Sequence, residues 1–423
     1  MDFRRSCRQI CLAPFVWFLT FMKTLLFVAA LCATAPLFAQ QTPTAAWTTL
    51  KIKSATLGNT RTVYVATPAG YATAVRRFPV LVLLDADDED QFNAAVANVR
   101  FLAGRGAIPE LILVGIVNGK DRGHDLSPGA DAANAKQHPT AGGASMFVDF
   151  IVHEVLPEIR AKYRTLPATF LGGHSLGGLV ALHAASTRRN FSGIIAMSPS
   201  LWWNDSTAAL GYADSLEHLS HPLRLFISSG ELEPAISVPT QRMVAHLDSV
   251  KPQWLTYTYH YYRAANHGLT PLLSLIDGVQ YLFEPMSVAH LPIATLGPGT
   301  DSADVMGAYL ASRATYVAGA RSLGFDASAL PEDQVNHLAY GVLRILELPQ
   351  LAVWLFRENV RDYPQSPNAY YGLGDGLLAV GDTASAIAQF RSGLEMATKF
   401  GQRGAAEAKR KLAALEHQGT KSP

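Results

Sequence analysis

Short apolar segments alternate with stretches of helical character through the first two thirds of the chain. Continuous apolar runs of this length are typical of parallel strands that are buried on both faces of a sheet. Helical patterns at 145–163 and 176–186 lie between them, so the sequence predicts an α/β fold with a doubly wound sheet. The apolar runs are FPVLVLLDADD, ELILVGIVN, ATFLGG, GIIAMSP and LRLFISSG.

Two further segments bound this alternation. Runs of β-branched and aromatic residues on either side of Gly58 and Asn59 predict an antiparallel hairpin. The segment WLTYTYHYYR predicts a last strand, and LLSLIDGVQYLF a helix that closes the domain near residue 285. We expect one domain over 40–285, followed by a linker at 286–302 that is rich in proline and glycine.

Residues 303–423 are expected to form a small all-α domain. Self-alignment gives a period of 34 residues, which pairs Ala352 with Ala386 and Phe356 with Phe390. Tetratricopeptide repeats have this period, so one clear and one degenerate repeat are predicted, while a helical hairpin that matches by chance is the alternative. We expect the unit to pack on the first domain and to offer a possible surface for a protein partner. The positions that match the repeat are Tyr370, Leu373, Gly374, Gly381, Ala386 and Phe390.

The first 39 residues have the pattern of an export signal. A basic residue, Lys23, precedes the apolar run TLLFVAALCATAPLFA, which ends in small residues before Gln40. We predict cleavage near Ala39 and a periplasmic or secreted protein without stable membrane insertion. Translation could start at Met1 or Met22, and a single N-terminal membrane anchor is the alternative to a cleaved signal.

Composition excludes several classes of function. All three cysteines, Cys7, Cys11 and Cys32, lie in the predicted signal, so a mature chain would contain no disulfide or thiolate metal site. The net charge of +1 gives no indication of nucleic-acid binding. His153-Glu154 lacks the second histidine of the H-E-x-x-H pattern, and neither a metal nor a cofactor is expected.

The sequence G-x-S-x-G at 173–177 follows a predicted strand and precedes a predicted helix. A sharp strand-to-helix turn of this kind projects a serine from the sheet in α/β-hydrolases, which makes Ser175 the candidate nucleophile. A serine needs a base, and in this fold the acid and then the histidine follow the serine along the chain. His267 lies in a loop after the last strand, and either Glu231 or Glu233, after LRLFISSG, could be the acid.

An oxyanion hole needs two backbone amides directed at the developing negative charge. One should come from Leu176, the residue after the nucleophile, and the second from the loop after FPVLVLLD, where we favour the amide of Asp87. The acidic run at 87–90 could instead be read as a calcium site, but a solvated loop is the preferred interpretation.

Several segments together resemble the family of esterases that includes esterase D and enterochelin esterase-like hydrolases. The similarity covers about residues 50–285 and implies a carboxylic ester hydrolase acting on a small-molecule ester. It implies triad roles for Ser175 and His267, and it favours Glu233 as the acid, three residues after Gly230. The segments are VLVLLDADDEDQF, PELILVGIVNGKDRGHDLSP, GGHSLGG, MSPSLWW and NHGLTPLLSLIDGVQYLF.

The same resemblance suggests residues that contact substrate. MSPSLWW places Trp202 and Trp203 near the acyl or leaving-group pocket, with core packing as the alternative. His174, which adjoins the nucleophile, is a third candidate. We therefore expect hydrolysis of a carboxylic ester through an acyl-enzyme, with a siderophore ester or an acylated sugar as the candidate substrates. Acyl transfer on the same fold is one alternative, and a non-catalytic scaffold that acts through its helical repeats is another.

Overall fold

The computed structural model describes residues 47–72, 76–287, 299–327, 329–400 and 405–419. The predicted signal peptide at 1–39 lies outside the described residues, as does most of the predicted linker at 286–302. No helix within the described ranges is long and apolar enough to cross a membrane.

An eight-stranded sheet forms the centre of the first domain, in the order β1-β2-β4-β3-β5-β6-β7-β8. The predicted hairpin is confirmed, because β1 pairs with β2 in antiparallel register, and β2 also pairs with β4 in this way. All other neighbours are parallel, as the apolar runs predict. The strands are β1 (Thr48–Lys53), β2 (Thr60–Ala66), β3 (Phe78–Leu83), β4 (Ile112–Ile116), β5 (Thr165–His174), β6 (Gly193–Met197), β7 (Leu223–Gly230) and β8 (Leu255–Tyr262).

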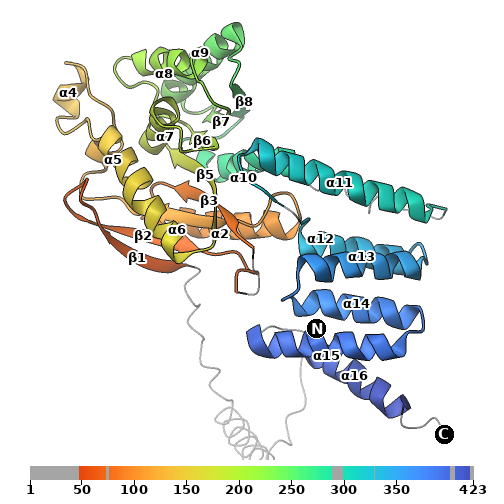
Figure 1. The fold of residues 1–423 in the computed structure, drawn as a ribbon. Coiled ribbons are helices and arrows are strands. Elements are labelled where there is room, and N and C mark those ends of the chain that lie inside the picture. Colours follow the sequence, from red (N-terminus) through yellow and green to blue (C-terminus); the bar gives the residue numbers. More distant parts are fainter. Residues whose placement is uncertain (1–46, 73–75, 288–298, 328, 401–404, 420–423) are drawn as a thin grey trace, which may run out of the picture. The chain divides into compact units, whose positions relative to one another are not determined.

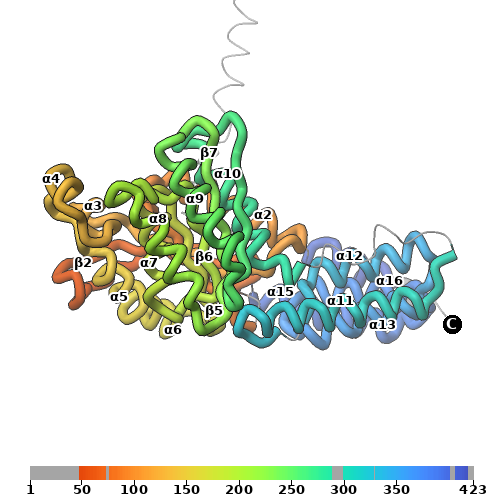
Figure 2. Tube along the Cα trace, turned by 90° about the horizontal axis from the view of Figure 1, so that it is seen from above, coloured from red at the N-terminus to blue at the C-terminus, as the bar shows by residue number. Residues whose placement is uncertain are grey.

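Helices cover both faces of this sheet (Figure 2). On one face, α2 (Glu89–Gly104) and α10 (Thr270–Phe283) pack in one apolar cluster. The opposite face has its own cluster, which confirms the predicted doubly wound α/β fold. Its helices are α5 (Ala144–Phe150), the π-helical turn η1 (Ile151–Val155), α6 (Leu156–Lys162), α7 (Leu176–Thr187), α8 (Thr207–Glu217) and α9 (Pro234–Val250).

A long connection between β4 and α5 contains only two short helices, α3 (Arg122–Asp125) and α4 (Asn134–Gln137). It is held against the loop after β6 by Asn204, whose Oδ1 accepts a hydrogen bond of 2.9 Å from the amide of Asp131. The part of the connection at α3 is held by an ion pair of 2.6 Å between Asp125 and Arg61 of β2, both buried. These two contacts fix the position of the connection at the carboxyl ends of the strands.

The segment after the 3-10 helix η2 (Glu284–Met286) is entirely helical in its described part, as predicted (Figure 1). Its apolar residues belong to the same cluster as α2 and α10, so one continuous core joins the two regions. Phe356 and Phe390, which the 34-residue period pairs, are both fully buried. Its helices are α11 (Ser302–Ser322), α12 (Glu332–Arg344), α13 (Pro349–Asp362), α14 (Pro367–Ala379), α15 (Thr383–Phe400) and α16 (Ala405–Gly419).

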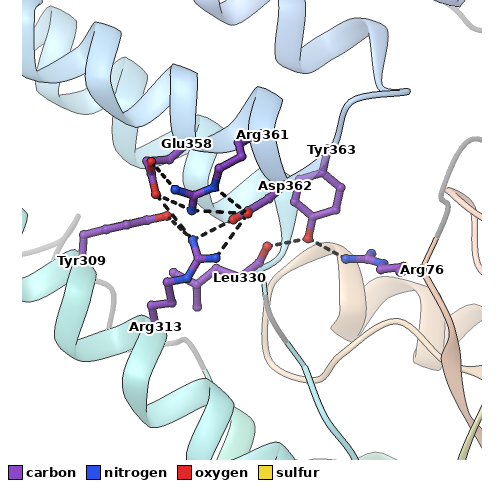
Figure 3. A network of polar contacts seen from close by, with 8 residues as sticks. All are labelled: Arg76, Tyr309, Arg313, Leu330, Glu358, Arg361, Asp362 and Tyr363. Carbon is purple, nitrogen blue, oxygen red and sulfur yellow. Dashed lines mark hydrogen bonds and ion pairs between the residues drawn. The ribbon is translucent and has the colours of Figure 1, made fainter.

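Polar contacts add to this shared core. Arg76 lies between the rings of Phe78 and Tyr363, at 5.4 and 5.1 Å from their centroids. It also donates a hydrogen bond of 2.6 Å to the hydroxyl of Tyr363, and that hydroxyl donates to the carbonyl of Leu330 at 2.5 Å (Figure 3). In the same network, Arg313 of α11 forms an ion pair of 2.8 Å with Asp362 at the end of α13.

Candidate active site

Ser175 lies at the junction between the last residue of β5 and the first residue of α7. Its backbone has φ 60° and ψ −119°, a conformation that an L-residue adopts only under tertiary constraint. Strain of this kind at a strand-to-helix turn is typical of a nucleophile elbow.

The glycines of G-x-S-x-G are required by close backbone contacts. A Cβ atom added at Gly173 would lie 2.3 Å from the carbonyl oxygen of Gly177. A Cβ at Gly177 would lie 2.9 Å from Oδ2 of Asp85, and one at Gly178 would lie 3.0 Å from the Cα of Pro199. Larger residues at these positions would therefore open the turn that presents Ser175.

Two residues that are distant in sequence meet beside this turn. Oε2 of Glu233, which follows β7, lies 2.5 Å from Nδ1 of His267, which follows β8. Glu233 is 6% exposed, whereas Glu231 is exposed and accepts a hydrogen bond of 2.8 Å from the amide of Ala264. Of the two glutamates that the sequence left open, only Glu233 has the contact that a triad acid needs.

The surroundings of Glu233 favour its ionised form. Burial alone would raise the pKa of this carboxyl group, but hydrogen bonds from His267, from the hydroxyl of Ser198 and from the amide of Gly230 outweigh burial and lower the pKa. An ionised Glu233 favours the proton of His267 on Nδ1 and leaves Nε2 free to accept a proton.

A contact between two histidine rings brings His267 close to the turn at Ser175. The ring of His267 packs against the ring of His174 at a centroid distance of 4.3 Å, and His174 directly precedes Ser175. Among the described residues no hydrogen bond joins Ser175 to His267, and Oγ of Ser175 lies 3.3 Å from Oγ of Ser200 instead. Such bonds are often long or absent before substrate binds, so the geometry is compatible with a catalytic pair.

His174 is held in its neutral form. Burial, followed by the proximity of His267, lowers the pKa of His174 to about 4. Its Nε2 atom is buried and has no hydrogen-bond partner within the described part of the chain. The sequence suggested His174 as a substrate-binding residue, and the structure places it against His267.

The backbone amides expected to form the oxyanion hole lack other partners. In the loop after β3, the amide of Ala86 donates to Ile116 and that of Asp88 donates to Asp85. No hydrogen bond from the amide of Asp87 or of Leu176 is present among the described residues. Both amides are therefore available for a developing oxyanion.

Asp85 fixes this loop, although sequence analysis did not single it out as a site residue. Its backbone has φ 60°, and its carboxylate accepts from Arg122 Nε at 2.6 Å and from Asn118 Nδ2 at 2.7 Å. Arg122 and Asn118 come from the long connection after β4. Only the tertiary structure brings them to the loop after β3.

The two tryptophans of MSPSLWW differ in environment. Trp203 is 1% exposed and its indole donates to the carbonyl of Gly129 at 3.3 Å, which favours a packing role. Trp202 is only partly buried and follows Ser200, the neighbour of the nucleophile. The ring centroid of His138, in the long connection, lies 6.0 Å from that of Trp202.

One group of potential metal ligands lies away from this site. Asp214, Glu217 and His218 share one side of α8 with their ligand atoms within 4.8 Å of one another. Asp214 and His218 are largely exposed, and the Glu217 carboxylate already lies 3.3 Å from Nε2 of His246. Nothing in the structure connects this group with the chemistry at Ser175.

Comparison with known proteins agrees with this geometry. Residues 54–269, slightly more than half of the chain, match the model of the family described as "Putative esterase". The siderophore triacetylfusarinine C esterase of Aspergillus fumigatus is 28% identical over 200 residues, which make up 45% of this chain and 62% of that protein. The chain spans less than two thirds of the length of the curated relatives it matches.

Solved structures show the same fold. An IroE-like serine hydrolase from Shewanella oneidensis is 26% identical with a TM-score of 0.60, covering 74% of this chain and 99% of its own. An uncharacterised protein from Capnocytophaga ochracea has a TM-score of 0.54 at 13% identity, covering 88% of this chain and 99% of its own. The second match extends beyond the sheet domain, so the shared fold includes helical residues after η2.

Proposed function

The chain belongs to the Putative esterase family of α/β-hydrolases, and from this premise we propose that it hydrolyses a carboxylic ester through an acyl-enzyme on Ser175. One observation carries the proposal: the buried carboxylate of Glu233 lies 2.5 Å from Nδ1 of His267, beside the strained turn that presents Ser175. A buried acid, a histidine and a strained serine are the components of a serine hydrolase site.

In the proposed mechanism Oγ of Ser175 attacks the ester carbonyl while Nε2 of His267 takes its proton. The amides of Leu176 and Asp87 bind the oxyanion, and the leaving alcohol receives the proton from His267 as the C–O bond breaks. Water then loses a proton to His267 and attacks the acyl-enzyme, and His267 returns that proton to Oγ of Ser175 as the acyl C–O bond breaks and the acid leaves. Glu233 keeps the imidazole oriented and stabilises its positive charge.

A siderophore ester is the substrate class we propose, with an acylated sugar as the alternative. The name of the Aspergillus fumigatus relative supports the first class, and the partly exposed Trp202 beside Ser200 offers an aromatic surface for a ring of the substrate. We also propose export, cleavage near Ala39, and a protein partner for the helical region. The sequence pattern of the first 39 residues supports export and cleavage, and the 34-residue period supports a protein partner.

A fluorophosphonate probe tests the mechanism directly. We expect labelling of Ser175 in the intact protein, and loss of both labelling and ester turnover in Ser175→Ala. Ser200→Ala is the matched control, because Oγ of Ser200 lies 3.3 Å from Oγ of Ser175. This variant should still be labelled at Ser175. Labelling of another serine, or full turnover by Ser175→Ala, would reject the proposed nucleophile.

The substrate class requires a separate experiment. Purified protein should be offered a ferric catecholate ester, a ferric hydroxamate ester, acetylated sugars and aryl esters of increasing acyl length. We expect the largest kcat/KM for one of the siderophore esters. A larger kcat/KM for the acetylated sugars would favour the alternative class.

A further inference from the structure

Two buried hydroxyl groups lie behind the proposed acid and base. Ser198 follows β6 and Thr270 begins α10, and neither is exposed to solvent. Such groups lose their hydrogen bonds to water on folding, so each must find a partner inside the protein. The partners of Ser198 and Thr270 are each other and the residues of the proposed triad.

The contacts form a closed ring through four residues. Oγ of Ser198 lies 2.5 Å from Oε1 of Glu233 and 2.8 Å from Oγ1 of Thr270. Thr270 Oγ1 in turn lies 3.1 Å from the backbone carbonyl of His267. The short contact between His267 and Glu233 completes the ring, which joins the loops after β6, β7 and β8.

The number of hydroxyl protons determines the direction of these bonds. Ser198 and Thr270 supply one proton each, whereas the ring contains three contacts to them. Glu233 in its ionised form can only accept, so Ser198 donates to it. Thr270 donates its own proton to the His267 carbonyl at 3.1 Å, and its Oγ1 accepts from Ser198 at 2.8 Å, so Ser198 shares its proton between Glu233 and Thr270.

The backbone of Ser198 shows that its position is enforced. Its φ is 43°, a conformation that is unfavourable for a residue with a side chain. Strain of this kind persists where surrounding contacts hold the residue, and it concentrates at functional sites. The amide of Ser198 donates 3.0 Å to the carbonyl of Ser228, which fixes it against the neighbouring strand.

We propose that Ser198 is a positioning residue of the hydrolase, whose hydroxyl aims the carboxylate of Glu233 at His267, with Thr270 linking that hydroxyl to the His267 backbone. The inference rests on the proposed function. Neither hydroxyl touches the reacting atoms. Both act through Glu233 and His267, whose mutual geometry sets the strength of the base.

Loss of the Ser198 hydroxyl has a defined electrostatic consequence. The hydrogen bond from Ser198 is one of the contacts that lower the pKa of Glu233, so its loss should raise that pKa, and Glu233 should lose its charge at a higher pH. The other charged or titratable groups that face this pair are His174, which remains neutral above pH about 4, and Tyr259 on β8. Asp85 and Arg122 lie behind His174.

The test compares Ser198→Ala with Ser274→Ala in the full-length protein on one aryl ester. Ser274 is the matched control, because it is also fully buried and its Oγ also pairs with another hydroxyl, at 2.7 Å from Oγ of Ser228. No contact with Glu233 is present among the described residues. For Ser198→Ala we expect kcat to fall about tenfold to a hundredfold with KM within about twofold. The acid limb of the kcat/KM profile should move to higher pH. Ser274→Ala should keep both parameters within about twofold.

Two further variants keep the test decisive if Ser198→Ala folds poorly. Ser198→Gly accepts the φ of 43° without strain yet lacks the hydroxyl, so it should show the same loss of kcat. Thr270→Val should lower kcat by about tenfold, and Thr270→Ser should restore it, because serine keeps the hydroxyl.

Equal kcat and an unmoved acid limb in Ser198→Ala and Ser274→Ala would overturn the positioning role. This outcome is distinct from failure of the proposed function. If wild-type protein is not labelled by fluorophosphonate at Ser175, the hydrolase proposal fails. If wild type is labelled and active while Ser198→Ala matches wild type, only the role of Ser198 fails.

Discussion

Oε2 of Glu233 lies 2.5 Å from Nδ1 of His267, although 34 residues separate them in the chain. Glu231, two residues before Glu233, accepts from the backbone of Ala264 and has no contact with His267 among the described residues. The two glutamates that follow the same predicted strand thus have different partners.

The first prediction concerns these glutamates. Glu233→Gln should lower kcat about a thousandfold or more, because an amide at this position no longer stabilises the imidazolium and can fix the wrong tautomer. Glu231→Gln, the matched control, should cost about tenfold or less. Steady-state kinetics of both variants on one ester decide the matter, and the reverse ranking would mean that Glu231 is the acid.

The second prediction concerns the dependence of stability on pH. The pKa of His174 is 6.5 in the unfolded chain and about 4 in the folded protein. Between these two pH values the unfolded state therefore binds more protons than the folded state. The free energy of unfolding should therefore decrease as pH falls from above 6.5 toward 4, by up to about 3 kcal/mol from this residue.

Urea unfolding at a series of pH values tests this dependence. His174→Gln should flatten the decrease, whereas His153→Gln, at a side chain that is 67% exposed, should leave it unchanged. An unaltered slope in His174→Gln would show that another group causes the decrease.

The third prediction separates the two tryptophans. Trp203→Ala should lower the free energy of unfolding by about 3–5 kcal/mol, because it removes a side chain that is 1% exposed. Trp202→Ala should cost less stability and should mainly raise KM for esters with an aromatic group. Chemical unfolding and kinetics on the same two preparations provide the measurement. A KM effect confined to Trp203→Ala would contradict this assignment.

The fourth prediction concerns the junction shown in Figure 3. Tyr363→Phe removes a buried hydroxyl that accepts from Arg76 and donates to the carbonyl of Leu330. It should lower the free energy of unfolding by about 1–3 kcal/mol, because the groups left behind lose their partner. Tyr370→Phe removes an exposed hydroxyl bonded to the carbonyl of Pro364 and should cost less than about 0.5 kcal/mol. Equal unfolding midpoints for the two variants would contradict a stabilising role for the junction.

The fifth prediction concerns export. If the basic start, apolar run and small-residue end form a cleaved signal, the mature chain should begin close to Gln40 and should be recovered outside the cytoplasm. Intact-mass measurement of protein from the periplasm or medium checks this. Recovery of uncleaved chain from the membrane fraction would favour the membrane anchor instead.

Local pattern was sufficient to predict the elements of the fold. Apolar runs bounded by turns predicted the strands, because a parallel strand buried on both faces needs apolar residues throughout. The glycines around Ser175 predicted the strained turn, since the close approach of Gly173 to Gly177 excludes a side chain. The position of His267 was also predictable. Ser175 and His267 each follow a predicted parallel strand, and the carboxyl ends of parallel strands lie at the same edge of the sheet.

The sequence by itself therefore determined the α/β class, the nucleophile turn and the set of candidate residues, because these depend on short-range periodicity and backbone conformation. The tertiary structure decided which side chains meet. It alone paired Glu233 with His267, buried Trp203 but not Trp202, and joined Ser198 to Thr270. These contacts join loops that follow different strands, and their geometry depends on how the strands align in the sheet, a property that local pattern does not specify.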